Sequence, residues 1–214
     1  LNPYDEIAVE EGLKLREKSS GEVVVVSLGT DANKETLRKA LAMGCDKAVV
    51  LKDSSPRDSF GVARALADYA KEYSPDIILC GKQSIDYDDA QVGGLVAEML
   101  GLPSISVVVI LDVTDGVIVA EREIEGGHEI VHSRLPAVII AQKGLNQPRY
   151  PSLKGIMDAK RKPIEERVVS AIKPRVEVLA MKKPSPKPHG KIVGTDASAI
   201  PELVRLLHEE AKVI

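Results

Sequence analysis

Three short runs of β-branched and aliphatic residues, separated by segments with helical periodicity, place the strongest constraint on how this chain can fold. The runs are Val23–Val26, Ala48–Leu51 and Ile77–Leu79, and none shows the apolar–polar alternation of a half-exposed strand. Such runs are typical of strands that are buried on both faces. Between them, apolar residues recur at intervals of three and four, as in helices that cover a sheet. The first hundred residues therefore predict an α/β fold with a mostly parallel sheet.

The periodicity changes after residue 103. Ser104–Asp112, Val117–Glu125 and Glu129–Ala141 predict strands, and the dipeptides Asp115-Gly116 and Gly126-Gly127 between them are typical of hairpin turns. The sheet should therefore include an antiparallel part.

The composition changes again in the last third of the chain. Six of the 13 prolines lie in residues 151–190, and the segment 182–188 alternates proline with lysine and serine, so it cannot form a regular helix or a central strand. Apolar residues at helical spacing then predict an amphipathic helix over 199–211. We expect an α/β domain over residues 1–157 and an extended arm with a terminal helix over 158–214.

Composition excludes several classes of protein. The 29 Lys and Arg against 32 Asp and Glu give a net charge of −3, and one Phe, five Tyr and no Trp leave few stacking platforms, so nucleic-acid binding is disfavoured. Cys45 and Cys80 lie in apolar stretches, which argues against a disulfide framework or a zinc site and for a reducing, cytoplasmic compartment. No run is long enough to cross a bilayer, and the sequence before Asp5 is no signal peptide. We expect the natural chain to begin upstream of Leu1.

One stretch of the arm has a distinct charge. Residues 158–191 hold ten Lys or Arg and four Asp or Glu, so this segment carries a charge of about +6 while the rest of the chain is acidic. A basic, proline-rich segment with scattered valines could embrace an acidic partner, or it could simply be solvated.

No glycine-rich phosphate-binding fingerprint occurs, so a nucleotide site has to be argued from position. The best candidate is Gly81–Val92, which leaves a buried strand at its carboxyl end and enters a helix, the edge where α/β sheets bind ligands. Gly81 would let the backbone approach a ligand, and Lys82 would supply a cation. Asp86, Asp88 and Asp89 would repel a phosphate unless they cap the helix, so ordinary turn-and-cap chemistry remains an alternative. Asn2–Asp5 begins the first helix in a similar way.

Catalytic arrangements are sparse. The four histidines show no metal-ligand spacing, no nucleophile elbow occurs, and Cys80 at the end of a buried run is better explained as a core residue than as a nucleophile. The chain does not resemble a hydrolase or a metalloenzyme.

Several segments together resemble the beta (small) subunits of electron transfer flavoproteins. The resemblance covers almost the whole chain in order, and its most specific part is Asn146–Met157. The other segments that carry it are Leu1–Glu11, Gly81–Gly93, Arg122–Gly127 and Leu135–Val138.

The resemblance implies a Rossmann-like fold, similar to that of the adenine nucleotide alpha hydrolases, and a heterodimer with a larger alpha subunit. An FAD held mainly by the alpha subunit would take electrons from dehydrogenases such as the acyl-CoA dehydrogenases of fatty acid oxidation and pass them to a membrane quinone oxidoreductase. The chain would thus be an electron carrier subunit rather than an enzyme, it would not itself enter the membrane, and the arm with its helix would wrap the alpha subunit.

The resemblance also implies two sets of binding residues. A structural AMP would contact the first helix start, the end of the second strand and the loop, that is Asn2, Pro3, Tyr4, Asp5, Leu28, Gly81, Lys82, Gln83, Ser84, Ile85, Asp86, Tyr87, Asp88, Asp89, Ala90, Gln91 and Val92. A recognition loop for the dehydrogenase would comprise Arg149, Tyr150, Pro151, Ser152, Leu153, Lys154, Gly155, Ile156 and Met157. Leu153 would be its apolar anchor, unless that side chain packs beneath its own helix.

Two departures from the family pattern leave alternatives open. The family begins with a strand and hairpin before the Asn-Pro motif, so we expect a central strand to be missing from residues 1–214. The loop ends in Ala90-Gln91-Val92, where AMP-type members carry Asn-Gln-Thr. Bifurcating members, which place a second FAD in the AMP position and oxidise NADH, are more similar here. AMP is our first choice, the second FAD is the alternative, and a stand-alone nucleotide-binding stress-type module is a further rival.

Overall fold

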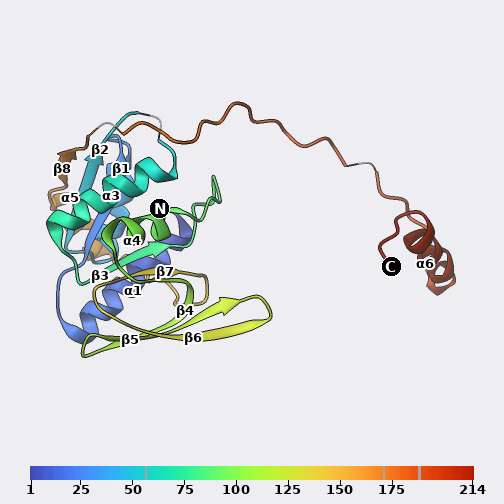
Figure 1. The fold of residues 1–214 in the computed structure, drawn as a ribbon, viewed down its shortest axis with the longest axis horizontal. Coiled ribbons are helices and arrows are strands. Elements are labelled where there is room, and N and C mark those ends of the chain that lie inside the picture. Colours follow the sequence, from blue (N-terminus) through green and yellow to red (C-terminus); the bar gives the residue numbers. More distant parts are fainter. Residues whose placement is uncertain (56, 171, 188) are drawn as a thin grey trace. The chain divides into compact units, whose positions relative to one another are not determined.

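The computed structural model describes residues 1–55, 57–170, 172–187 and 189–214, so Pro188 of the proline-rich segment lies outside the described residues. The described chain divides into two compact units, Leu1–Glu177 and Val178–Ile214 (Figure 1).

The first unit has the predicted alternation of helices and strands. Its elements are α1 (Pro3–Ser19), β1 (Val24–Gly29), α2 (Asn33–Met43), β2 (Lys47–Lys52), α3 (Ser59–Tyr73), β3 (Ile77–Gly81), α4 (Val92–Leu100), β4 (Ser104–Thr114), β5 (Val117–Ile124), β6 (Gly127–Arg134), β7 (Ala137–Ala141), α5 (Leu153–Arg161) and β8 (Glu165–Val168).

The strands form two sheets, which confirms the α/β class with parallel and antiparallel parts. One sheet has the order β1-β2-β8 and is parallel throughout. The other has the order β3-β7-β4-β5-β6, in which β7 pairs in parallel with β3 and β4, while β5 pairs antiparallel with β4 and β6. β1 and β3 are edge strands, and both are only half-buried despite their apolar sequences.

β4 serves both the parallel and the antiparallel part because it contains a bulge. Its pairing with β7 shifts register between Ile105 and Val108, and Val107 within the bulge has a φ of 61°. The guanidinium of Arg122 donates from Nε to the backbone oxygen of Ser106 and from Nη2 to its Oγ, each at 3.1 Å. These two hydrogen bonds from Arg122 therefore stabilise the bulge, at which β4 passes from its pairing with β7 to its pairing with β5.

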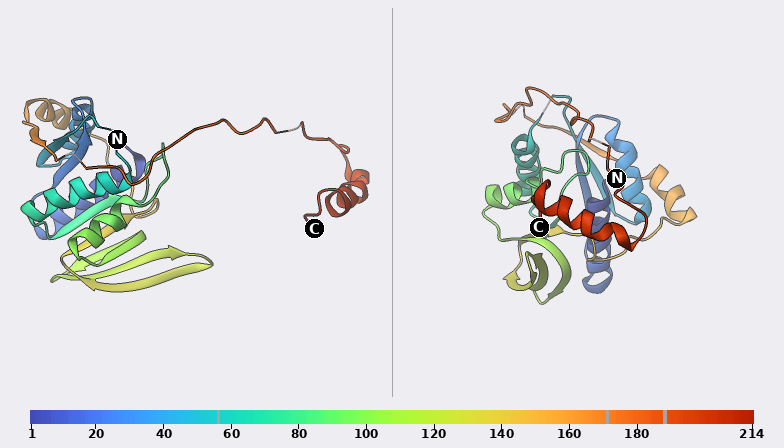
Figure 2. Two further views of the ribbon diagram at one scale, coloured as in Figure 1. Left: turned by 45° about the horizontal axis from the view of Figure 1, so that its top comes forward. Right: turned by 90° about the vertical axis from the view of Figure 1, so that its right-hand side faces the viewer.

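The core lies between the sheets and the helices that cover them (Figure 2). The largest fully buried side chains come from both sheets, from α1, α2 and α4, and from the turn before β2; they are Leu13, Leu37, Leu51, Ile118, Ile139, Val49, Val50, Val96, Val108, Val138 and Cys45. The apolar runs and helical spacing predicted these elements with one error: the expected strand Glu129–Ala141 is two strands, β6 and β7, which Leu135 and Pro136 separate, and β6 pairs antiparallel while β7 pairs in parallel.

The first unit extends further along the chain than residue 157. α5 lies beside α2, and the backbone oxygen of Ala42 is 2.5 Å from where a Cβ on Gly155 would be. β8 then pairs with β2 in the parallel sheet. The division of the structure therefore falls after Glu177, because residues 158–177 are held by the α/β unit.

The second unit contains a short 3₁₀ helix, Ala197–Ala199, and α6, Ile200–Glu209. Ile200, Leu203 and Val204 on α6 are exposed. Within the described ranges, no helix combines the length and the apolar character required to cross a bilayer.

Candidate functional site

The start of α1 meets the loop between β3 and α4, although the two segments are some 80 positions apart in sequence. Asn2 Nδ2 donates to the backbone oxygen of Gln83 at 2.9 Å and to Asp5 Oδ2 at 2.9 Å. Asp5 Oδ1 accepts from the backbone N–H of Gly81 at 2.8 Å. The structure thus joins the two segments that sequence reasoning selected separately as nucleotide-binding candidates.

Gly81 is required by this junction rather than by a ligand alone. A Cβ on Gly81 would lie 2.6 Å from the backbone N of Asp5 and 2.6 Å from the carbonyl carbon of Tyr4. Gly81 does not have the positive φ for which glycine is favoured. The missing side chain of Gly81, and not a left-handed backbone, therefore makes room for α1.

The three aspartates of the loop do not cap α4. The helix starts at Val92 after Gln91, and its N-terminus has no side-chain cap. Asp88 accepts from Gln83 Nε2 and Asp89 accepts from Ser59 Oγ, each at 2.8 Å. Hydrogen bonding from Ser84 lowers the pKa of Asp86. The carboxylates hold the loop together, which corrects the capping prediction.

The same arrangement leaves the N-terminus of α4 available to an anion. Its first turn contains no acidic residue, and its N–H groups carry the positive end of the helix dipole. The backbone of Lys82 is fixed at the end of β7, since its N–H donates to the oxygen of Ala141 at 2.9 Å. Asn2 Oδ1 is buried and has no hydrogen-bond partner among the described residues. Lys82 and the N-terminus of α4 lie at the two ends of the β3–α4 loop, to which Asn2 is hydrogen-bonded through the oxygen of Gln83.

The loop itself is strained and exposes apolar side chains. Asp88 and Ala90 have φ values of 55° and 53°, in the left-handed region that costs a residue with a Cβ about 1 kcal/mol or more. Ile85 and Tyr87 are largely exposed. The remaining candidate, Leu28, lies at the end of β1 and packs against the core cluster around Val49 and Leu51, not against the loop.

The recognition-loop residues form an exposed apolar surface around the start of α5. The side chain of Leu153 is 85% exposed and that of Tyr150 is 97% exposed, while Ile156 and Met157 are exposed to a lesser degree. Ser152 Oγ accepts from the N–H of Gly155 at 3.0 Å and so caps the helix. Leu153 does not pack beneath its own helix, so the structure excludes that alternative.

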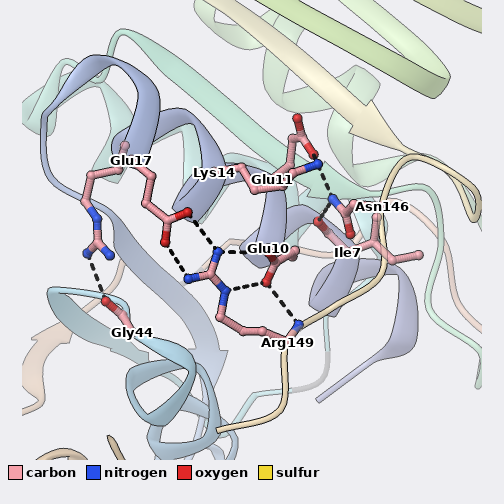
Figure 3. A network of polar contacts seen from close by, with 9 residues as sticks. Ile7, Glu10, Glu11, Lys14, Glu17, Gly44, Asn146 and Arg149 are labelled. Atoms are coloured by element: carbon pink, nitrogen blue, oxygen red, sulfur yellow. Dashed lines mark hydrogen bonds and ion pairs between the residues drawn. The ribbon is translucent and has the colours of Figure 1, made fainter. Parts of the chain in front are cut away.

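Arg149 has a different position from the residues that follow it. Its side chain turns back onto α1, where it binds Glu10 and Glu17 (Figure 3). The hydrogen bonds that Arg149 donates to Glu10 and, to a smaller extent, to Glu17 raise the pKa of Arg149. Sequence reasoning missed Glu10 and Glu11, which are the buried charged residues of the described chain, because acidic residues on a helix normally face solvent.

A second unpredicted cluster fixes the segment that leads to the second unit. Asp58 caps α3 by accepting from Gly61 N at 2.8 Å, and its other oxygen accepts from the backbone N–H groups of Arg175 and Val176 at 2.7 and 2.9 Å. The Arg175 guanidinium lies 3.7 Å from the ring centre of Phe60. Since Ser59 also donates to Asp89, the start of α3 contacts both the β3–α4 loop and residues 175–176, which we call the arm root.

The cysteines fit the structural interpretation. Burial raises the pKa of Cys80 to about 12 and that of Cys45 to about 11, which leaves both as poorly nucleophilic thiols. In the part of the chain that the structure describes, no group of three or more His, Cys, Asp or Glu side chains could hold a metal ion.

Comparison of the amino-acid sequence with known proteins identifies a family for this chain. The family sequence model described as "Electron transfer flavoprotein domain" matches residues 1–172. The electron transfer flavoprotein subunit beta of Bacillus subtilis is 40% identical over 225 residues, which cover all of this chain and 88% of that protein. The subunit of the same name from Syntrophomonas wolfei is 41% identical over 191 residues (89% and 76%), and the mitochondrial one of Arabidopsis thaliana is 38% identical over 221 residues (100% and 86%).

Proposed function

The chain belongs to the electron transfer flavoprotein family, and we propose that it acts as the beta subunit of a heterodimer that carries electrons from dehydrogenases to a quinone oxidoreductase of the membrane. The observation that carries this proposal is the exposed Leu153 on the capped start of α5. Because the side chain of Leu153 is 85% exposed, it contributes little to the free energy of folding. An exposed leucine on an ordered helix contributes more by burying its side chain against a partner. The donors in this proposal are acyl-CoA dehydrogenases or related enzymes, so the chain would take part in fatty acid oxidation.

The redox chemistry belongs to an FAD that the alpha subunit holds for the most part and that accepts and releases electrons when bound. The part of this chain is to bind, orient and dock. We assign it the role of a carrier subunit rather than an enzyme, which the names of its relatives as electron transfer flavoprotein subunits support.

A structural AMP fits the residues at the junction of α1 with the β3–α4 loop. The uncapped N-terminus of α4 and the cation of Lys82 suit a phosphate. The orphaned Asn2 Oδ1 can accept a hydrogen bond from a hydroxyl or amino group of a nucleotide. The aspartates that would repel the phosphate already accept hydrogen bonds within the protein.

A second FAD in the same place is the alternative, in which the heterodimer oxidises NADH and bifurcates electrons. The loop sequence Ala90-Gln91-Val92 favours this alternative over the AMP type. Both ligands contain an adenosine phosphate, so the same junction could hold either.

Analysis of the ligands released from the purified heterodimer tests these proposals together. We expect one FAD and one AMP per heterodimer, by mass spectrometry and flavin absorbance. Two FADs with NADH oxidation would establish the bifurcating alternative. A monodisperse monomer that carries ATP and recruits no alpha subunit would instead identify a stand-alone nucleotide-binding module and refute the carrier function.

A further inference from the structure

Segment 146–149, which leads into the proposed docking surface, is fastened to one face of α1 by buried polar contacts. Arg149 holds Glu10 with three donors: its backbone N at 3.1 Å and Nε at 2.8 Å reach Oε2, and Nη2 at 2.9 Å reaches Oε1. Glu10 is 5% exposed, so this carboxylate has been removed from water. Glu17, about two helical turns further along α1 and half-exposed, accepts from Nη1 and Nη2 of the same guanidinium (Figure 3).

A second tie holds the beginning of the segment. Asn146 Nδ2 donates to the backbone oxygen of Ile7 at 3.0 Å and to Glu11 Oε2 at 2.8 Å. Glu11 is as buried as Glu10. The segment is thus attached to α1 at both ends.

The contacts with Glu10 and Glu11 fix the position of segment 146–149 on α1. A buried carboxylate without its partner is costly, so Glu10 and Glu11 favour the one arrangement in which Arg149 and Asn146 reach them. The exposed side chains of Tyr150 and Leu153 make no comparable contacts of their own. Their location therefore depends on the attachments that flank them.

The other flank is equally fixed. α5 begins at Leu153, is capped by Ser152, and approaches α2 so closely at Gly155 that a Cβ there would lie 2.5 Å from the oxygen of Ala42. Leu153 therefore projects from a short span with the Arg149 attachment on one side and the α2 contact on the other.

We propose that Glu10 and Arg149 are positioning residues for partner docking, which hold Leu153 in its binding position before the dehydrogenase arrives. This inference rests on the proposed docking role of Leu153. Holding the loop in advance removes an ordering cost from association, so the pair acts on the affinity for the partner and not on the flavin. The expected signature is a change in KM for the heterodimer as electron acceptor, with kcat preserved.

The test uses the purified heterodimer, with an acyl-CoA dehydrogenase and its acyl-CoA as the electron source. We expect Arg149→Gln to raise KM on the order of tenfold, because one ordered loop is released. The rate of chemical reduction by dithionite, which needs no docking, should not change. Hydrogen exchange of residues 150–157 should accelerate in the same variant.

Lys14→Gln is the matched control. Lys14 lies on the same helix, and its Nζ is 3.8 Å from Glu11, so its loss removes one positive charge near the segment without detaching it. An equal rise in KM for Lys14→Gln and Arg149→Gln would show that charge, not position, sets docking, and would overturn the proposal.

Leu153→Ala separates this inference from the proposed function. If Leu153→Ala raises KM about thirtyfold and Arg149→Gln adds less than about twofold in that background, the two residues act as one unit. No effect of Leu153→Ala refutes the docking function itself. An effect of Leu153→Ala with none of Arg149→Gln refutes only the positioning role.

Arg149→Gln leaves Glu10 buried and unpaired, so a second variant guards against loss of folding. Glu10→Gln with Arg149→Gln removes both charges and should restore assembly while keeping the raised KM, since the bidentate ion pair is absent. If neither variant forms a heterodimer, the pair is a folding element and the positioning role is wrong.

Discussion

Replacing Gly81 by alanine tests the junction between α1 and the β3–α4 loop. The new Cβ would lie 2.6 Å from two backbone atoms of α1, whereas ordinary contacts begin near 3.4 Å. The helix start and the strand end must therefore separate by about 0.8 Å. Backbone cannot rotate away as a flexible side chain can, so the strain is shared by the whole helix.

The cost follows from two terms. Overpacking of a close contact costs about 1–3 kcal/mol. The separation also stretches the 2.8 Å hydrogen bond from Gly81 N–H to the Asp5 carboxylate, and a bond to a charged group contributes about 1.5–3 kcal/mol. We expect Gly81→Ala to destabilise the protein by about 3 kcal/mol and to reduce nucleotide occupancy through displacement of Asn2.

Gly94→Ala is the control within the same region. Apart from its chain neighbours and the backbone of its own helix, no described atom lies within 4 Å of the Cβ that would be added to Gly94, the third residue of α4. Alanine should therefore stabilise the helix by about 0.8–1 kcal/mol. Urea unfolding of the heterodimer, followed by circular dichroism, measures both variants, and released nucleotide is quantified in parallel. Equal stability and full occupancy in the two variants would refute the tight contact between α1 and β3.

Four further predictions concern the other binding elements. Leu153→Ala should leave the melting temperature unchanged, because the side chain is exposed, yet should weaken dehydrogenase docking by about 2 kcal/mol in titrations; a lowered melting temperature would favour a core role. Lys82→Ala should cost roughly 1–3 kcal/mol of nucleotide affinity by calorimetry, and unchanged affinity would place the phosphate elsewhere. Hydrogen bonds from Gly61 and then the arm root lower the pKa of Asp58, so the stability it contributes is present above its unfolded pKa near 3.8 and is lost as the pH falls below that value. Protease cleavage after Arg175 should accelerate over that acidic range in the wild type but be fast and less dependent on pH in Asp58→Ala. Truncation after Glu177, which keeps β8 in its sheet, should abolish copurification with the alpha subunit; a tight heterodimer of the truncated chain would show that the arm is not needed.

Local pattern accounts for most of the fold. The continuous runs at Val23–Val26, Ala48–Leu51 and Ile77–Leu79 became parallel strands, and Asp115-Gly116 became a hairpin turn, because periodicity and turn chemistry act between neighbours in sequence. The second hairpin turn is Glu125-Gly126 rather than Gly126-Gly127, since Gly127 begins β6. The exposure of Leu153 also followed from local features, since Ser152 caps a helix whose first residue faces outward. The assignment of this segment as a docking loop, in contrast, depends on the resemblance to the family and not on periodicity.

The errors arose where several local solutions were equally plausible. Three aspartates before a helix predict a cap, but left-handed backbone at Asp88 and Ala90 carries the chain past them, and the helix starts at Val92. Their carboxylates bind Gln83 and Ser59 instead. Glycine at position 81 likewise suggested a ligand close to the backbone, whereas the neighbour that the structure shows there is α1, which the sequence near Gly81 does not reveal.

Local pattern thus predicted most of the helices and strands, their order and the residue types at the sheet edges, but not β8, which lies in the segment expected to be an extended arm. The burial of particular charges and the choice of their partners depend on the tertiary structure. Arg149 and Glu10 are 139 positions apart, and Asp58 and Arg175 are 117 apart. From sequence, a glutamate on a helix is expected to face solvent, whereas Glu10 is buried because the fold places Arg149 against it. The physical reason is that periodicity is a property of neighbours in sequence, whereas the pairing of a buried charge depends on which distant segment the topology brings within about 3 Å.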